Sequence, residues 1–173
     1  MNSIAIKGII CPILTPMYED ESINEQELRN QVNRLIDAGI HGLFAFGTNG
    51  ESYALSTAEK ERVLEIVVEE TNHRVPVYAG SGCITTKETI ALSKKAFEIG
   101  ADALSIVTPF YAAASQEELR ITWMLRLRWI CPSSCTTFLP ERATHWLPRR
   151  SAALRRAPPT LWVSRIPAGI STI

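Results

Sequence analysis

Four short apolar runs punctuate the first part of the chain and predict buried strands. They cover residues 8–14, 41–46, 75–79 and 103–107. Each run is nearly continuous in apolar residues instead of alternating with polar ones, which is typical of a strand covered on both faces. Such strands belong mainly to parallel sheets, so the pattern favours an α/β fold.

A polar pair that marks the start of a helix follows each run. In all four cases a Ser, Thr or Asn stands three residues before a Glu, as in a capping box. The pairs are Asn24 with Glu27, Ser56 with Glu59, Thr85 with Glu88 and Ser115 with Glu118. After the first three pairs, apolar residues recur on one helical face. Gly39 and Gly100 then stand where a helix C-cap is expected.

The pattern of strand and helix repeats at 32, 29 and 30 residues between successive capping residues. A repeat of this kind makes parallel βα units with right-handed crossovers. The two candidate folds are a doubly wound sheet and a (β/α)8 barrel. A complete barrel needs roughly 250 residues, and only three units and the start of a fourth can be recognised, within residues 1–118.

The composition changes abruptly after residue 118. Residues 1–118 hold 9 basic and 17 acidic side chains, whereas residues 119–173 hold 9 basic and 1 acidic, so the net charge of zero hides −8 and +8. All nine basic residues of the second part are Arg, and all four Trp lie there. With 46% hydrophobic residues, the whole chain is neither collagen, nor a coiled coil, nor wholly disordered. We therefore divide it into an α/β domain, residues 1–118, and an aberrant tail, residues 119–173.

Neither a membrane nor a secretory route is indicated. No run of about 18 apolar residues occurs, and Cys11 and Pro12 interrupt the only apolar stretch near the N-terminus, so no signal peptide fits. The four cysteines lack the spacing of a small disulfide scaffold, and we expect a cytoplasmic protein. His41 and His73 have no Cys or carboxylate at ligand spacing, so no metal site is expected.

The loops after the predicted strands hold the candidate chemistry, because parallel α/β folds carry active residues at the carboxyl ends of their strands. In the loop after the second run, Gly47 and Gly50 permit a tight turn, and Thr48 and Asn49 offer a hydroxyl and an amide. On these residues alone, the tetrapeptide could equally be a simple turn. Tyr111, after the fourth run, could equally be a half-buried packing residue.

The loop motifs resemble those of the dihydrodipicolinate synthase and N-acetylneuraminate lyase family. The stretches that carry the resemblance are residues 8–16, 42–52, 78–82 and 107–111, within a nearly continuous likeness over residues 4–119. The resemblance implies a truncated (β/α)8 TIM barrel of about four βα units. It also implies a lyase that joins pyruvate, or another 2-oxo acid, to an aldehyde through a lysine Schiff base. Such proteins are usually homotetramers and use neither cofactor nor metal.

Three residues take roles from this resemblance by their position in the motifs. Thr48 matches the residue whose hydroxyl joins a proton relay near the pyruvate carboxylate. Asn49 stands beside that carboxylate, where the family usually has Thr or Gly. Tyr111 matches the tyrosine that reaches across a dimer interface into the relay of the neighbouring subunit. We therefore expect Thr48 and Tyr111 to be catalytic, and Thr48 and Asn49 to bind substrate.

The Schiff-base lysine of the family has no counterpart, because no Lys follows Lys95. The motifs Y-N-x-P-x-R-T-G and G-V/I-K-[DE] are also missing from residues 119–173. Both motifs can be recovered, in order, if one base has been lost from the gene near Leu119 or Arg120. Each original codon then consists of the third base of one present codon and the first two bases of the next. Residues 130–144 can then encode L-P-V-V-L-Y-N-I-P-A-R-T-G, and residues 159–170 can encode N-I-V-G-V-K-D-S-S-G-D. We therefore expect an out-of-frame tail that is irregular or disordered.

Three kinds of function follow from these observations. The first is a lyase by family, similar to 4-hydroxy-tetrahydrodipicolinate synthase, with N-acetylneuraminate lyase or a 2-keto-3-deoxy sugar acid aldolase as the alternatives. The chain of 173 residues, lacking the lysine, is then expected to be inactive. The second is a nucleic-acid-binding tail, in which Arg meets phosphate and Trp stacks on bases, but the tail has no recognisable binding motif. The third is a fragment without function, because half a barrel leaves an unpaired strand edge.

Overall fold

The computed structural model describes residues 8–108, 115, 117–118, 135–138 and 160–165. Strands and helices alternate in the first part: β1 (Ile10–Pro12), α1 (Glu25–Asp37), β2 (Gly42–Ala45), the 3-10 turn η1 (Thr48–Gly50), α2 (Thr57–Thr71), β3 (Val77–Gly80), α3 (Thr86–Ile99) and β4 (Ala103–Val107). Two more strands, β5 (Cys135–Phe138) and β6 (Thr160–Arg165), lie in the tail. The four predicted strands and the first three predicted helices are confirmed.

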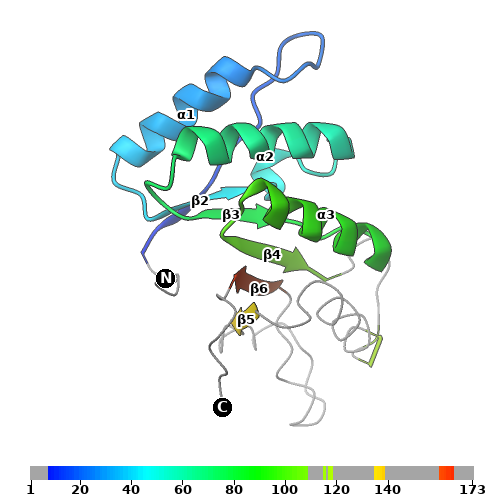
Figure 1. Cartoon of the computed structure of the whole chain (residues 1–173). Coiled ribbons are helices and arrows are strands. Elements are labelled where there is room, and N and C mark those ends of the chain that lie inside the picture. Colours follow the sequence, from blue (N-terminus) through cyan, green and yellow to red (C-terminus); the bar gives the residue numbers. More distant parts are fainter. Residues whose placement is uncertain (1–7, 109–114, 116, 119–134, 139–159, 166–173) are drawn as a thin grey trace.

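Strands β1 to β4 form a parallel sheet in the order in which they occur in the chain. Helices α1, α2 and α3 all lie on one face of this sheet (Figure 1). A doubly wound sheet carries helices on both faces and reverses its strand order at a switch point. The sequential order and the one-sided helices instead match the first units of a (β/α)8 barrel. This arrangement decides between the two folds that the sequence left open.

The helices begin at the predicted caps. The backbone N–H of Glu59 donates to the Ser56 hydroxyl at 3.3 Å, and the backbone N–H of Ser56 donates to the Glu59 carboxylate at 2.7 Å, which are the two bonds of a capping box. Asn24 and Thr85 accept from the residue three positions later in the same way. Ser115 and Glu118 form a second complete box. All four predicted helix starts therefore have the expected hydrogen bonds.

The core lies between the sheet and the helices. Alternate strand residues point to the helical side and are almost fully buried: Leu43, Ala45, Val77, Ala79, Leu104 and Ile106. They share one cluster with the apolar faces of α1 and α2, among them Leu28, Val32, Leu64 and Val67. Burial of each Leu, Val or Ile side chain in this set stabilises a fold by about 1.5–3 kcal/mol. The rigid layer so formed carries the loops that follow the strands.

The tail contributes two strands to the far edge of the sheet. Strand β6 runs antiparallel to β4, with Thr160 opposite Val107 and Ser164 opposite Ala103, and β5 runs antiparallel to β6. The structure therefore differs from the predicted irregular tail at these two segments. Strand β5 holds two Thr and a Phe, and β6 holds Thr, Trp and Val, which favour strands, and β4 offers β6 an edge. A continued βα repeat would place a parallel strand beside β4, so the repeat ends there within the described residues.

Candidate functional site at the carboxyl edge of the sheet

Four strand ends meet at one edge of the sheet. Because β1 to β4 are parallel, the residues Pro12, Ala45, Gly80 and Val107 end them on the same side (Figure 1). The loop after β2 forms η1 and holds two of the three predicted site residues, Thr48 and Asn49. The prediction that they follow a strand at this edge is confirmed. Tyr111, the third, lies outside the described residues.

Backbone hydrogen bonds define the conformation of η1. The N–H of Gly50 donates to the carbonyl of Gly47 at 3.1 Å, and the N–H of Glu51 donates to the carbonyl of Thr48 at 3.1 Å. Glu51 closes the turn in the left-handed region, with a φ of 49°. The loop therefore presents Thr48 and Asn49 on a single 3-10 turn.

Gly50 brings the loop after β2 against the loop after β1. A Cβ at this position would lie 3.0 Å from the carbonyl oxygen of Ile13, closer than side chains normally approach. The hydroxyl of Thr15 donates to the Gly50 carbonyl at 2.9 Å. Sequence reasoning assigned Gly50 to a tight turn, whereas the contact with Ile13 and Thr15 gives it a second role in joining two loops.

The side chains of Thr48 and Asn49 are exposed at this edge. A Thr hydroxyl both donates and accepts a hydrogen bond, and an Asn amide offers two donors and one acceptor. Together they supply neutral donors to an acceptor-only group such as a carboxylate. The arrangement suits binding of a small anionic molecule and transfer of a proton through the hydroxyl.

A group of buried hydroxyls supports the neighbouring loop after β3, and sequence reasoning missed it. The Ser93 hydroxyl of α3 donates to the Ser81 hydroxyl at 2.8 Å, and both side chains are fully buried. The backbone N–H of Cys83 donates to the Thr89 hydroxyl at 3.0 Å. The only signal in the sequence is the four-residue spacing of Thr85, Thr89 and Ser93, which places hydroxyls on one helical face.

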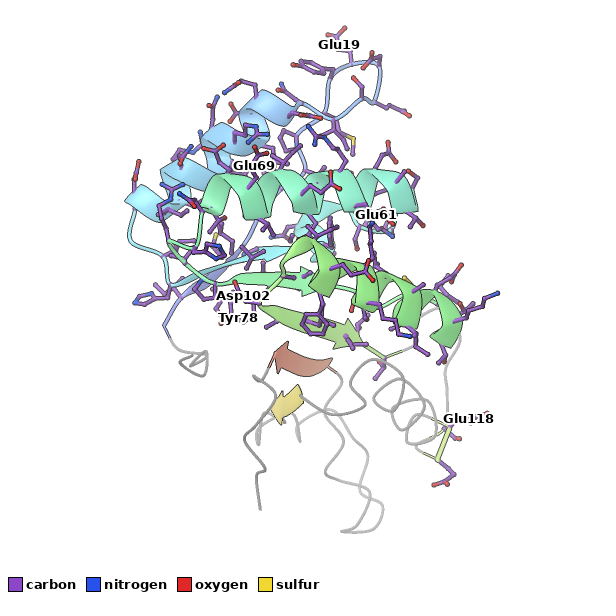
Figure 2. All side chains as sticks on the ribbon, in the orientation of Figure 1. Glu19, Glu61, Glu69, Tyr78, Asp102 and Glu118 are labelled. Carbon is purple, nitrogen blue, oxygen red and sulfur yellow. The ribbon has the colours of Figure 1, made fainter. Side chains whose placement is uncertain are left out.

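Tyr78 and Asp102 lie near one another at the other end of the sheet (Figure 2). Tyr78 is 1% exposed, and burial raises the pKa of its hydroxyl, with a smaller contribution from the charge of Asp102. Asp102 accepts the backbone N–H of Val77 at 2.8 Å. Tyr78 lies near the start of β3 and Asp102 directly precedes β4, at the end of the sheet away from Thr48, so both lie apart from the candidate site.

The described part of the chain has neither a metal-binding cluster nor a membrane-spanning helix. Over the described residues, His, Cys, Asp and Glu side chains form no group of three or more that could hold a metal ion. Among the helices of the described part of the chain, none is long and apolar enough to span a bilayer.

A parallel sheet with helices on one face and polar loops at its carboxyl edge defines the N-terminal part of a (β/α)8 barrel, with the loops where such barrels carry their active sites. Comparison with known proteins gives the family. The model of the dihydrodipicolinate synthetase family matches residues 5–122, and the chain belongs to this family. The family resemblance carried by the loop motifs is thereby confirmed.

Similar proteins carry two kinds of name. The chain is 49% identical over 117 residues to the 4-hydroxy-tetrahydrodipicolinate synthase of Methanopyrus kandleri, covering 67% of this chain and 39% of that protein. It is 40% identical over 113 residues to the N-acetylneuraminate lyase of Shigella boydii, covering 65% and 38%. The crystal structure of dihydrodipicolinate synthase from Acinetobacter baumannii complexed with pyruvate matches with a TM-score of 0.72 and 35% identity, over 73% of this chain and 44% of that one.

The matches share one limit. The chain spans about two fifths of the length of these relatives. The match to the family model ends at residue 122, close to the point where the net charge of the chain changes from negative to positive.

Proposed function

We propose that residues 1–118 are the N-terminal half of a lyase that joins pyruvate to an aldehyde through a lysine Schiff base. Family membership and the pyruvate complex of the similar Acinetobacter structure support this proposal. The observation that carries it is the place of Thr48 and Asn49, which are exposed on η1 at the carboxyl edge of the sheet. This is where barrels of this class carry their chemistry.

In this proposal the two residues have different tasks. The Asn49 amide donates a hydrogen bond to the carboxylate of the 2-oxo acid and so orients it. The Thr48 hydroxyl passes a proton between substrate and a second hydroxyl, which we assign to Tyr111. An amine nucleophile completes the chemistry, because its protonated imine withdraws electrons from the carbon that forms the new bond. By the family resemblance we assign this nucleophile to a lysine of the half that is not recognisable here; Lys95, the last Lys of the sequence, lies in α3.

The chain of 173 residues is therefore proposed to be inactive, with a tail translated out of frame. Its two motifs can be recovered in one alternative frame, in the family order, and the lysine codon straddles Ser164 and Arg165. Sequencing the gene across codons 115–125 tests this part. An added or missing base relative to related genes is expected, and an uninterrupted frame shared with close relatives would contradict the proposal.

The second substrate distinguishes the two kinds of relative. Thr48 together with Tyr111 favours aspartate semialdehyde, as in the synthases, and the first of the relatives above carries a synthase name. An N-acetylneuraminate lyase is the alternative, supported by the Shigella relative, and a 2-keto-3-deoxy sugar acid aldolase is another. A frame-restored protein should condense pyruvate with aspartate semialdehyde faster than with N-acetylmannosamine. The reverse order would assign it to the lyases.

The remaining proposals concern assembly and location. By family, we propose a cytoplasmic homotetramer for the frame-restored protein, without a nucleic-acid or membrane partner. Its mass in solution, measured by light scattering, should be four times that of one subunit. A monomer would contradict this proposal without affecting the assignment of Thr48 and Asn49.

A further inference from the structure

Gln31 is a buried polar side chain near the middle of α1. It is 7% exposed and lies beside the core residue Val32. Its side-chain carbonyl accepts the backbone N–H of Leu14 at 2.9 Å. A buried amide costs free energy unless it is hydrogen-bonded, and an apolar residue would fill the same place without that cost. The bond to Leu14, which lies outside α1, is the evident reason for a glutamine here.

The loop segment that Gln31 holds is hydrogen-bonded to η1 through the next residue. Leu14 is followed by Thr15, whose hydroxyl donates to the carbonyl of Gly50 at 2.9 Å. On the other side of Leu14, the backbone N–H of Ile13 donates to the carbonyl of Phe44 at 3.0 Å. The segment of residues 13–15 is thus fixed to α1 by Gln31 and fixed to η1 by Thr15.

We propose that Gln31 is a positioning residue for η1. Through Leu14 and Thr15, its side-chain carbonyl keeps Gly50, and with it Thr48 and Asn49, at a fixed distance from α1. The consequence for substrate binding rests on the proposed function, whereas the backbone linkage does not.

A second anchor confines the effect of Gln31 to this linkage. The backbone N–H of Asn24 donates to the carbonyl of Pro16 at 2.9 Å, which ties the same loop to the start of α1. Loss of the Gln31 bond therefore releases Leu14 and Thr15 while Pro16 stays attached. We expect local loosening of residues 14–15 and of η1, with the helices unaffected.

Amide hydrogen exchange of the full chain tests this proposal. The variant Gln31→Met has the same length and no acceptor. In this variant, the amides of Leu14, Gly50 and Glu51 should exchange about five- to tenfold faster, the factor for one lost hydrogen bond. The amides of Ile66 and Val67, buried in α2, should keep their rates. Gln31→Glu retains the acceptor and should restore slow exchange at all three positions.

A second variant probes the far side of the linkage without touching α1. Thr15→Val should speed exchange at Gly50 and Glu51 and leave Leu14 protected. Faster exchange at Leu14 alone in Gln31→Met would overturn the proposal, because the loop would then not depend on Gln31. Equally faster exchange at Ile66 would also overturn it, since Gln31 would be a general stabilising residue. Exchange is measured without pyruvate, so a frame-restored protein that forms no Schiff base would leave this result unchanged.

Discussion

The hydroxyl of Thr15 donates a 2.9 Å hydrogen bond to the carbonyl of Gly50, across 35 positions of sequence. The bond joins the loop after β1 to the turn that carries Thr48 and Asn49. The residue that positions this turn, Thr15, is thus different from the residue that we propose to act chemically on it, Thr48, although both are threonines. This separation makes the account testable one residue at a time.

Thr15 and Thr48 form a matched pair for such a test. Thr15→Val removes a partly buried hydrogen bond and should lower the free energy of unfolding by about 1 kcal/mol. Thr48→Val changes an exposed hydroxyl and should alter stability by less than about 0.5 kcal/mol. In a frame-restored protein, however, Thr48→Val should reduce kcat by about 100-fold or more, as expected for a lost proton-transfer group. Urea unfolding and steady-state kinetics measure the two effects, and an equal loss of stability in both variants would contradict the division of roles.

The hydroxyl pair of Ser81 and Ser93 should be non-additive. Ser93→Ala leaves the buried Ser81 hydroxyl without the donor that now meets it at 2.8 Å, which costs about 1–3 kcal/mol. Ser81→Ala should cost a similar amount. The double variant loses both partners together and should be less destabilised than the sum of the two single changes. Thermal unfolding of the original chain, the two single variants and the double variant gives the coupling free energy between the two hydroxyls. Strict additivity would show that they do not interact.

The lowered pKa of Glu70 predicts that the stability of the fold depends on pH. Hydrogen bonds from Asn33 and then from Arg29 lower the pKa of this carboxyl, against the effect of burial. Because its pKa is lower in the folded than in the unfolded chain, its contribution is present above the unfolded pKa. It is lost as the pH falls through the folded pKa. Glu70→Gln should therefore be less stable than the original chain at neutral pH. The difference in free energy of unfolding between the two, measured by urea unfolding, should shrink as the pH falls. A difference that stays constant with pH would contradict the claim that the ionised Glu70 carboxylate stabilises the fold.

The sequence predicts well whatever depends on neighbouring residues. Ser56 and Glu59 are three positions apart, so their capping box follows from local geometry. The apolar run over residues 41–46 likewise placed Thr48 and Asn49 after a strand. Contacts such as Gln31 with Leu14, or Ser93 with Ser81, depend on how elements pack. The sequence does not reveal which residue a glutamine in a helix will bond, because the partner depends on which segment packs against that helix.

The tail shows a different limit. Strand β6 pairs with the edge of β4 and β5 pairs with β6, so the pairing depends on an available edge as much as on the residues of the tail. Periodicity along residues 119–173 alone therefore did not reveal them. Tyr111 stays a prediction, since it lies outside the described residues.

Borohydride reduction in the presence of pyruvate tests the central claim most directly, because it traps a lysine Schiff base as a stable amine. The chain of 173 residues should give no adduct. A frame-restored protein should give one adduct per subunit, at the lysine whose codon straddles the present Ser164 and Arg165. An adduct on the present chain, or none on the restored protein, would contradict the claim that this chain is the first half of a Schiff-base lyase.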